Sequence, residues 1–211
     1  MLQLKNKKSV WVVTGSSGTG KSSYAVLVLG NGNFTCRFIF DPRDDEMSLR
    51  FRRRSCHVPA ELNAAISTGW VIFNPHTMFP GDPQKGLEKF AEWAWVKSGA
   101  MPGQKVFYCD EVWKYCSPHF IPKPLAVMLM DGRKSGIGTL LTTHSPHRMN
   151  AVIIGEATEL ISFQLRGELK LDYLRKNCDE FPVDKLKDLP SLHYIAMNLD
   201  SGGTATGVIK F

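Results

Sequence analysis

Short apolar runs alternate along this chain with segments whose apolar residues recur at helical spacing. The first run, V-W-V-V at residues 10–13, is followed by a glycine-rich loop and then by an apolar, helix-like segment ending at Leu29. Similar apolar runs predict strands at residues 36–40, 70–73, 106–109, 138–143 and 159–165. Between the strands we expect helices at residues 59–67, 87–96, 124–130, 149–154 and 169–175, and a helical turn at 182–186.

This alternation of strands and helices predicts the fold class. Strands that are apolar throughout are typical of a mostly parallel sheet with helices on both faces, because both sides of each strand are then buried. The last stretch, H-Y-I-A-M-N, D-S-G-G and T-A-T-G-V-I-K-F, predicts a β-hairpin. We therefore expect a single α/β domain over residues 1–211, with a core at 10–165 and C-terminal helices and a hairpin at 166–211. Its ligands should bind beyond the carboxyl ends of the strands.

Residues 15–22 have the spacing of a phosphate-binding loop. Their sequence, G-S-S-G-T-G-K-S, fits G-x-x-x-x-G-K-[ST] between a predicted strand and a predicted helix. Glycines let successive backbone N–H groups curve around a phosphate, and the helix start adds a positive dipole end. Lys21 would reach the β and γ phosphates of ATP, and the Ser22 hydroxyl would bind Mg²⁺. The predicted nucleotide contacts are Gly15, Ser16, Ser17, Gly18, Thr19, Gly20, Lys21, Ser22 and Ser23.

A second motif, V-F-Y-C-D-E at residues 106–111, ends an apolar strand in two carboxylates. Asp110 would contribute to the nucleotide site by holding Mg²⁺ through water. Glu111 would activate the water that attacks the γ-phosphate. Neighbouring side chains of an extended strand point in opposite directions, so the two acids need different roles. The two motifs together predict an ATPase with ATP and Mg²⁺ as cofactors and with Lys21 and Glu111 as catalytic residues.

The stretch after the two acids carries a family resemblance. A helix ending in G-R-K-S-G-I-G at residues 132–138, then a buried strand and T-T-H-S-P at 142–146, resembles the FtsK-HerA superfamily of ring ATPases. Within it, residues 10 to about 165 are most similar to the genome-packaging ATPases of membrane-containing icosahedral DNA viruses. The resemblance implies a RecA/ASCE-like P-loop NTPase fold and a homo-oligomeric ring, a hexamer or pentamer, that moves double-stranded DNA into a preformed capsid. It also implies capsid vertex proteins as partners, and a location in the host cytoplasm or at the packaging vertex of the virion.

The resemblance assigns further catalytic roles. Arg133 matches the arginine that relatives insert into the neighbouring subunit's site, although an arginine at a helix end could also pair with its own helix dipole. His144 stands where the family usually has glutamine in its sensor motif, which is a departure. A neutral imidazole can donate and accept, so His144 could still read the γ-phosphate, or Thr143 could supply that contact.

Composition and charge narrow the partners. With 43% hydrophobic and 22% charged residues, a folded soluble protein is expected, and no apolar run approaches the roughly eighteen residues of a membrane-spanning helix. The start of the chain lacks the apolar centre of a secretory signal, so we expect a cytoplasmic protein with no integral membrane segment. The net charge of +6 favours a polyanionic partner such as DNA. Five scattered cysteines indicate reduced thiols, and a zinc site at Cys109, Cys116 and His119 lacks a suitable fourth ligand.

A charged stretch at residues 43–54 ends in a run of arginines at residues 50–54, the arginine run, which has three possible roles. It could contact DNA phosphates, reach across a subunit interface, or lie on a solvated loop. The aromatic residues Phe90, Trp93 and Trp95 could stack on bases, but their helical spacing favours packing in the core. The candidate nucleic-acid contacts are Arg50, Arg52, Arg53 and Arg54, with Arg37, His147 and Arg148 as weaker candidates.

Three other functions compete with DNA packaging. A filamentous-phage assembly ATPase related to zonula occludens toxin shares the two nucleotide motifs, but such proteins usually carry a membrane-spanning segment. A small P-loop kinase could use the arginine run as a lid, although Glu111 directly after Asp110 argues against it. For a non-catalytic nucleotide-gated binding module, Glu111 would be surplus.

Overall fold

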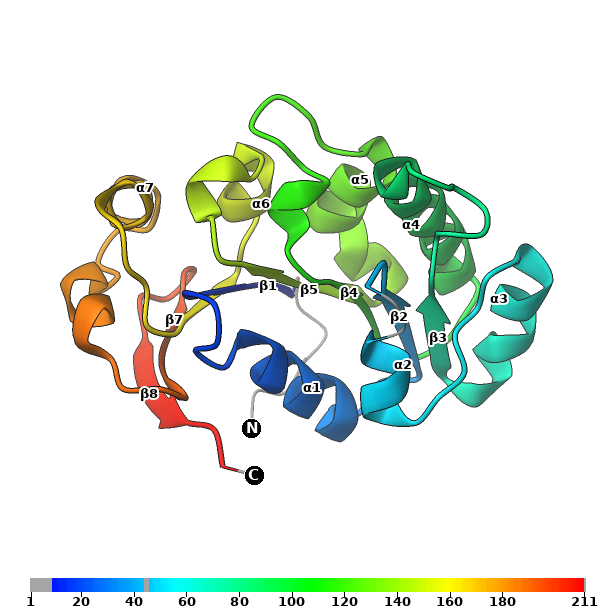
Figure 1. The fold of residues 1–211 in the computed structure, drawn as a ribbon, viewed down its shortest axis with the longest axis horizontal. Helices are drawn as coiled ribbons and strands as arrows, with labels where there is room; N and C mark the ends of the chain where they lie inside the picture. The colour runs from blue at the N-terminus through cyan, green and yellow to red at the C-terminus, as the bar shows by residue number, and fades with distance from the viewer. Residues whose placement is uncertain (1–8, 44–45, 211) are drawn as a thin grey trace.

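An eight-stranded sheet runs through the part of the protein that the computed structural model describes, residues 9–43 and 46–210 (Figure 1). In sheet order the strands are β3 (Trp70–Phe73), β2 (Cys36–Phe40), β4 (Lys105–Cys109), β5 (Ile137–Thr143), β1 (Val10–Thr14), β6 (Glu159–Ser162), β7 (His193–Asn198) and β8 (Thr204–Val208). The strands from β3 to β6 are parallel to their neighbours, whereas β7 and β8 are antiparallel. Residues 1–8, residues 44–45 of the charged stretch and Phe211 at the end of the hairpin lie outside the described residues.

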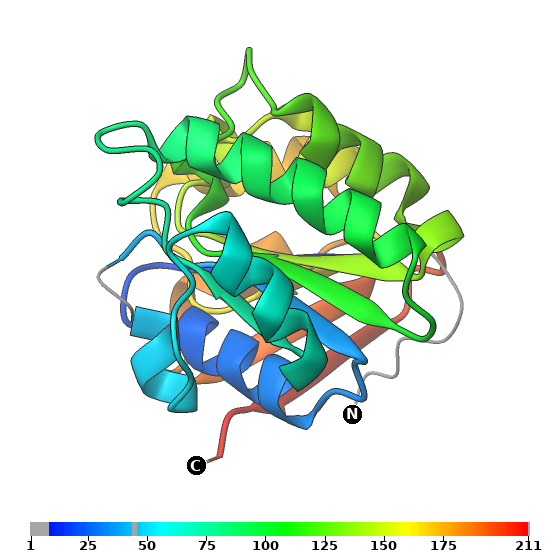
Figure 2. The same cartoon turned by 90° about the vertical axis from the view of Figure 1, so that its right-hand side faces the viewer.

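Helices cover both faces of this sheet. In Figure 1, α4 (Pro83–Gly99), α5 (Lys123–Asp131) and α6 (Ala151–Gly155) lie above the sheet, and α1 (Lys21–Asn31) and α2 (Glu46–Phe51) lie below it. Figure 2 shows the same layers from the side. Among the described residues, no helix has both the length and the apolar character needed to cross a membrane. The remaining elements are α3 (Pro59–Ala65), α7 (Glu168–Asn177) and the 3-10 turns η1 (Ile66–Thr68), η2 (Val112–Lys114), η3 (Gly132–Ser135), η4 (Pro146–Arg148) and η5 (Val183–Asp188).

The strands are apolar on both sides because each face meets helices. On β1, Val10 and Val12 pack into the core shared with α4 and α5, while Trp11 and Val13 pack into the core shared with α1. Phe90 of α4 is buried, and Trp93 and Trp95 pack against the same core, so these aromatic residues belong to the core as the helical spacing predicted. The mostly parallel sheet, covered on both faces and extended by a hairpin, confirms the predicted α/β fold.

Several element boundaries differ from those that the sequence predicts, and hydrogen bonds explain the differences. α4 begins at Pro83 rather than at residue 87, because the Asp82 carboxylate accepts a hydrogen bond from the Lys85 backbone N–H and caps the helix. Within the charged stretch at 43–54, the structure contains α2, in which the Met47 and Ser48 N–H groups donate to the Asp41 carboxylate. β6 ends at Ser162 rather than at residue 165, since the chain then turns toward η5.

The C-terminal hairpin, formed by β7 and β8, is attached to the loop between β1 and α1. Just before β7, Leu192 donates a backbone hydrogen bond of 3.1 Å to the carbonyl of Thr19 and accepts one of 3.0 Å from Ile209. Leu192 has a φ of 64°, a conformation that costs free energy in a residue other than glycine and persists only where its surroundings fix it. The last segment of the chain therefore supports the first loop.

Candidate nucleotide site

The phosphate loop lies between β1 and α1, and close neighbours require glycine at two of its positions, Gly15 and Gly20. Gly20 has a φ of 122°, which residues with a Cβ rarely adopt, and a Cβ there would lie 2.9 Å from the Phe163 ring. A Cβ on Gly15 would lie 2.8 Å from Cβ of Phe163. The Ser16 N–H donates to the carbonyl of Gln164 at 2.7 Å, which fixes the start of the loop beside the end of β6. The loop is therefore a defined backbone structure.

Lys21 is buried within this loop. Its Nζ donates to the carbonyl of Ser16 at 3.1 Å and lies 3.9 Å from Oε1 of Glu111. Burial lowers the pKa of Lys21, and the charges of Glu111 and Asp110 oppose that shift. Ser22 and Ser23 follow in the first turn of α1, where both are partly exposed. The predicted contacts of Lys21 with the phosphates and of Ser22 with the metal stay predictions.

Asp110 follows the end of β4, and both of its carboxylate oxygens are engaged. Oδ1 accepts a hydrogen bond from the Thr142 hydroxyl on the neighbouring strand β5. Oδ2 lies 3.0 Å from Nη1 of Arg43, which comes from the loop after β2 on the other side of β4. The carboxylate is therefore held from both flanking strands.

Glu111 is held even more firmly. Its Oε2 accepts hydrogen bonds from the Trp113 indole at 2.9 Å, from the His144 N–H at 3.0 Å and from His144 Nδ1 at 2.7 Å. Its φ of 48° is left-handed, an uncommon conformation for glutamate that is concentrated at functional sites. Burial alone would raise the pKa of Glu111, but the two His144 hydrogen bonds and the charge of Lys21 outweigh it and lower the pKa. The carboxylate is therefore ionised, and Nδ1 of His144 carries the proton of that hydrogen bond.

The residues at this edge suit Mg²⁺ bound together with a nucleotide. Ser22 offers a hydroxyl and Asp110 a carboxylate, and Mg²⁺ is usually held by one or two carboxylates together with substrate phosphates. Among the described residues, no group of three or more histidine, cysteine and acidic side chains could hold a metal alone. Cys109 and Cys116 are buried free thiols.

The sensor position holds His144 at the end of β5, between the strand of the two acids and the strand of the phosphate loop. The His144 ring meets the Trp113 ring edge to face at a centroid distance of 5.3 Å. Thr143, the alternative sensor, is fully buried and its hydroxyl accepts a hydrogen bond from the Ser145 N–H. Of the two residues, His144 is the one that contacts Glu111.

Arg133 lies at the amino ends of the parallel strands, whereas the phosphate loop lies at their carboxyl ends. It belongs to η3, which precedes β5, whereas the loop follows β1, and the two strands are parallel. The seven residues of β5 span about 20 Å at the usual rise per residue, so Arg133 is too distant to reach its own nucleotide site. Its side chain is exposed, and among the described residues its guanidinium has no ion-pair partner. The structure leaves this guanidinium available to another molecule.

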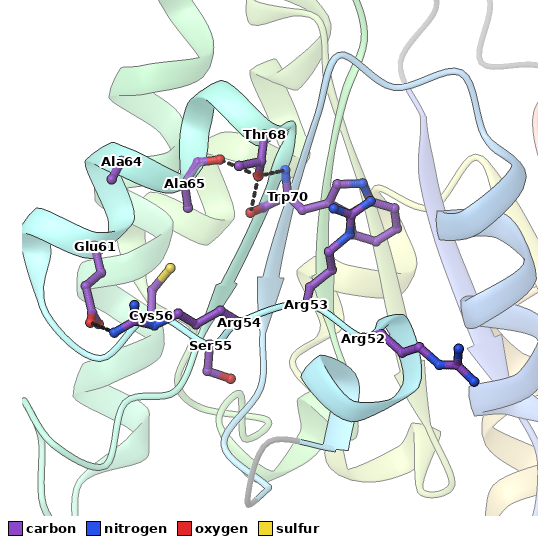
Figure 3. Close-up of a pocket in the computed structure, with 10 residues that line it drawn as sticks. All are labelled: Arg52, Arg53, Arg54, Ser55, Cys56, Glu61, Ala64, Ala65, Thr68 and Trp70. Atoms are coloured by element: carbon purple, nitrogen blue, oxygen red, sulfur yellow. Dashed lines mark hydrogen bonds and ion pairs between the residues drawn. The ribbon is translucent and has the colours of Figure 1, made fainter.

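The arginine run lies beside the edge strand β3, around a cavity of about 410 Å³ (Figure 3). Figure 3 shows the side chains of Arg52, Arg53 and Arg54 pointing in three different directions. Arg54 pairs with Glu61 at 2.9 Å, and Arg53 lies 5.7 Å from the centre of the Trp70 ring. Arg50 pairs with Glu46 on α2 at 2.9 Å. The four arginines do not converge on one point, and two of them are neutralised within the chain.

Two of the weaker basic candidates, Arg37 and Arg148, have structural partners. Arg37 is buried, and its guanidinium donates to the carbonyls of Leu29, Gly32 and Phe34 at the end of α1. This excludes Arg37 as a contact for DNA in this structure. Arg148 lies over the Trp113 ring at 5.4 Å, next to the partly buried His147.

Three residues of the site were not predicted from the sequence. Arg43 and Thr142 hold Asp110, and Trp113 holds Glu111. Trp113 lies two residues after Glu111, so proximity to the acids was a usable signal. Arg43 and Thr142 come from strands far apart in the sequence, and only the order of strands in the sheet brings them to Asp110.

The phosphate loop follows β1 and the two acids follow β4, so both lie at the carboxyl ends of the parallel strands. This arrangement defines the fold of a P-loop NTPase. Solved structures agree. The genome packaging NTPase B204 from Sulfolobus turreted icosahedral virus 2, in complex with sulfate, superimposes with a TM-score of 0.79 at 16% identity, over 97% of this chain and 98% of that one. The same NTPase has been solved with ATP-gammaS and with AMPPCP.

Two further proteins share the fold. VirB4 of Thermoanaerobacter pseudethanolicus gives a TM-score of 0.70 at 12% identity, over 96% of this chain and 89% of that one. The N-terminal domain of zonular occludens toxin from Neisseria meningitidis gives 0.51 at 9% identity, over 97% and 94%. These similarities confirm the P-loop NTPase fold that the sequence resemblance implies. No protein-family model matches the chain, and no curated protein matches it in sequence.

Proposed function

We propose that this protein is an ATPase that uses ATP hydrolysis to move double-stranded DNA into a preformed viral capsid. The observation that carries the proposal is the meeting of Lys21 and Glu111 at 3.9 Å beside the phosphate loop, with His144 bound to the same carboxylate. A cation for the phosphates and a held carboxylate for the attacking water are the groups that ATP hydrolysis needs. The similarity to a genome packaging NTPase supports the packaging role.

Each residue of the site has a role in this reaction. The loop N–H groups from Gly15 to Ser23 bind the triphosphate, and Lys21 donates to its β and γ phosphates. Glu111 accepts a proton from water as the water oxygen bonds to the γ-phosphorus. The bond from that phosphorus to the bridging oxygen then breaks, which releases ADP and phosphate. Mg²⁺, held by Ser22 and Asp110, would neutralise charge on the phosphate oxygens.

The subunits are proposed to form a ring of five or six copies in which Arg133 completes the neighbour's site. Arg133 is exposed and on the edge of the sheet away from its own phosphate loop, so it could serve a site only in another copy. There its guanidinium would neutralise charge on the transferred phosphoryl group. A site divided in this way would couple hydrolysis in one subunit to the position of the next.

Contacts with DNA are proposed for the basic surface that includes the arginine run. Arg52 has no ion-pair partner among the described residues, and Arg53 lies on an aromatic ring, so these two could be free to bind phosphates. Arg50 and Arg54 would first have to leave Glu46 and Glu61. A channel that accepts a whole genome should contact phosphates rather than base edges. The remaining proposed partners are capsid vertex proteins, and the proposed location is the host cytoplasm or the packaging vertex of the virion.

A second candidate is a phage-assembly ATPase, because the fold is also similar to the N-terminal domain of zonular occludens toxin. ATP turnover measured with and without double-stranded DNA, over a range of protein concentrations, separates the candidates. We expect DNA to stimulate turnover and turnover to rise more than linearly with protein, since each site needs a neighbour. Turnover that is the same with and without double-stranded DNA would favour the assembly ATPase. Turnover that requires a small phosphate acceptor would indicate a kinase. Lys21→Ala should abolish turnover and serves as the negative control.

A further inference from the structure

Arg43 is a cation of the nucleotide site that is fixed in place by the fold. It follows β2, the strand paired with β4, and the register that aligns Phe40 with Cys109 brings the residues after β2 beside the two acids. The Arg43 carbonyl accepts a hydrogen bond of 2.9 Å from the Glu46 N–H, and the preceding Pro42 carbonyl lies 2.8 Å from Nε2 of His76. The backbone is therefore anchored at Pro42 and at Arg43 itself.

The Arg43 guanidinium forms an ion pair with the Asp110 oxygen that Thr142 of β5 does not contact. Nη1 lies 3.0 Å from Oδ2, while Thr142 binds the other oxygen, Oδ1. Among the described residues, Arg43 is the only cation within 4.0 Å of Asp110. The Asp110 side chain is 12% exposed and that of Arg43 is 39% exposed, so this contact is more shielded from solvent than an ordinary surface ion pair.

The electrostatic surroundings keep Arg43 charged. Burial would lower its pKa, but Asp110, Glu111 and Glu46 outweigh burial and raise it. The Arg43 charge is also felt by Lys21, whose pKa it helps to lower, so the two cations stand around the same pair of carboxylates. A guanidinium also presents several N–H donors that suit phosphate oxygens.

We propose that Arg43 exchanges partners during the nucleotide cycle: it holds Oδ2 of Asp110 until metal-bound triphosphate enters, and then donates to the γ-phosphate. This inference rests on the proposed function and adds to it a cation from the same chain, separate from Arg133. The exchange makes two separable statements. Arg43 competes with Mg²⁺ for Asp110, and Arg43 favours a triphosphate over a diphosphate.

Binding measurements on the full chain test both statements without hydrolysis. The first titrates Mg²⁺ against a fluorescent ADP, which has no γ-phosphate, in the wild type, in Arg43→Gln and in Arg43→Lys. Removing the competitor should lower the half-saturating Mg²⁺ concentration of Arg43→Gln about three- to tenfold, the effect of an ordinary hydrogen bond, because solvent around the partly exposed Arg43 weakens its contact with Asp110. Arg43→Lys, which keeps a charge, should stay closer to the wild type.

The second measurement compares a nonhydrolysable fluorescent ATP analogue with fluorescent ADP at saturating Mg²⁺. Arg43→Gln should reduce the preference for the triphosphate about tenfold. Lys89→Gln is the matched control, because it removes a cation from the exposed Lys89–Glu92 pair on α4 and should change neither quantity.

The outcomes separate this inference from the proposed function. A wild-type protein that binds no triphosphate overturns the proposed function and the inference with it. Wild-type binding, together with an unchanged Mg²⁺ midpoint or an unchanged triphosphate preference in a folded Arg43→Gln, overturns the exchange alone. A midpoint that rises in Arg43→Gln would also overturn it, since Arg43 would then assist the metal rather than compete with it.

Discussion

Glu111 and His144 are joined by two hydrogen bonds to a single carboxylate oxygen, one from the His144 backbone N–H and one from its imidazole Nδ1. The other oxygen, Oε1, lies toward Lys21. Glu111 is thus held by one oxygen while the other faces the phosphate loop. This division favours a carboxylate that is positioned to act on a water molecule at the γ-phosphate.

Glu111→Gln should bind ATP and fail to hydrolyse it. The amide keeps the size of the carboxylate and can still accept hydrogen bonds from His144, but it cannot take a proton from water. We expect turnover to fall at least about 100-fold, as for loss of a general base, with little change in affinity for a nonhydrolysable analogue. Phosphate release and analogue binding would measure the two effects. Turnover at the wild-type rate would show that Glu111 is not the base.

Substitutions of His144 should separate the contribution of its imidazole to turnover from that of its backbone N–H. His144→Gln retains a side-chain donor for Oε2 of Glu111, so turnover should stay within a few fold of the wild type. His144→Ala keeps only the backbone N–H, and loss of one hydrogen bond to a charged group should slow turnover about tenfold or more. Steady-state kinetics of both variants would decide the matter. Wild-type rates in both variants would mean that the side chain has no part in positioning Glu111.

Arg133→Ala should be inactive alone and recover activity when mixed with Glu111→Gln. A mixed ring contains interfaces at which an intact Glu111 meets an intact Arg133 from the neighbour, so partial turnover should return. Lys134→Ala is the control, because Lys134 is an adjacent exposed cation that pairs with Asp131 at 2.7 Å. It should be active without a partner. Mixtures that show no more turnover than their separate components would contradict action between subunits.

The arginine run makes a graded prediction about DNA. Arg52→Gln should lower the slope of log affinity against log salt by about one unit, as expected for the loss of one phosphate contact. Arg54→Gln should have a smaller effect, because Arg54 is already paired with Glu61. Fluorescence anisotropy with a DNA duplex at several salt concentrations would measure both slopes. Unchanged slopes in both variants would place the run on a solvated loop or a subunit interface.

Glu159 should make the protein less stable as the pH rises. Burial raises the pKa of this β6 carboxyl from 4.5 to about 7, so the folded protein retains a proton that the unfolded chain has released. Stability therefore falls between about pH 4.5 and 7, and is constant above that range as far as this group is concerned. Glu159→Gln should raise the free energy of unfolding by about 1–3 kcal/mol at pH 8. The gain should shrink to less than half at pH 5.

Denaturant unfolding at the two pH values would measure this difference. Glu92→Gln is the control, since Glu92 is exposed and paired only with Lys89 on the surface of α4. A gain from Glu159→Gln that is the same at both pH values would show that the carboxyl does not titrate in this range.

The sequence predicts the sheet well because its strands are apolar on both faces. β2 and β3 have the predicted bounds, and the hairpin falls where the turn residues indicate. The sequence does not predict that β4 starts at Lys105, because lysine is rarely buried. In the structure its ammonium group donates to the carbonyls of Met101 and Gly103, which satisfies the charge inside the protein.

The nucleotide site likewise contains residues that the sequence predicts and contacts that it does not. Lys21, Ser22, Asp110 and Glu111 are predicted because each belongs to a short motif whose spacing has a physical reason, and their catalytic and metal roles stay predictions. The contact of Arg43 with Asp110 could not be predicted, since it depends on β2 lying next to β4. No spacing within either segment specifies that strand order.

The hydrogen bond from Leu192 to Thr19 makes the phosphate loop depend on a segment far from it in the sequence. During synthesis on a ribosome, Thr19 emerges long before Leu192, so the loop forms this hydrogen bond only after the residues between them have been made. A shortened protein that lacks Leu192 and the hairpin would retain both nucleotide motifs, but its phosphate loop would lack this hydrogen bond. The loop therefore has its full set of hydrogen bonds only once the segment that leads into the hairpin is present.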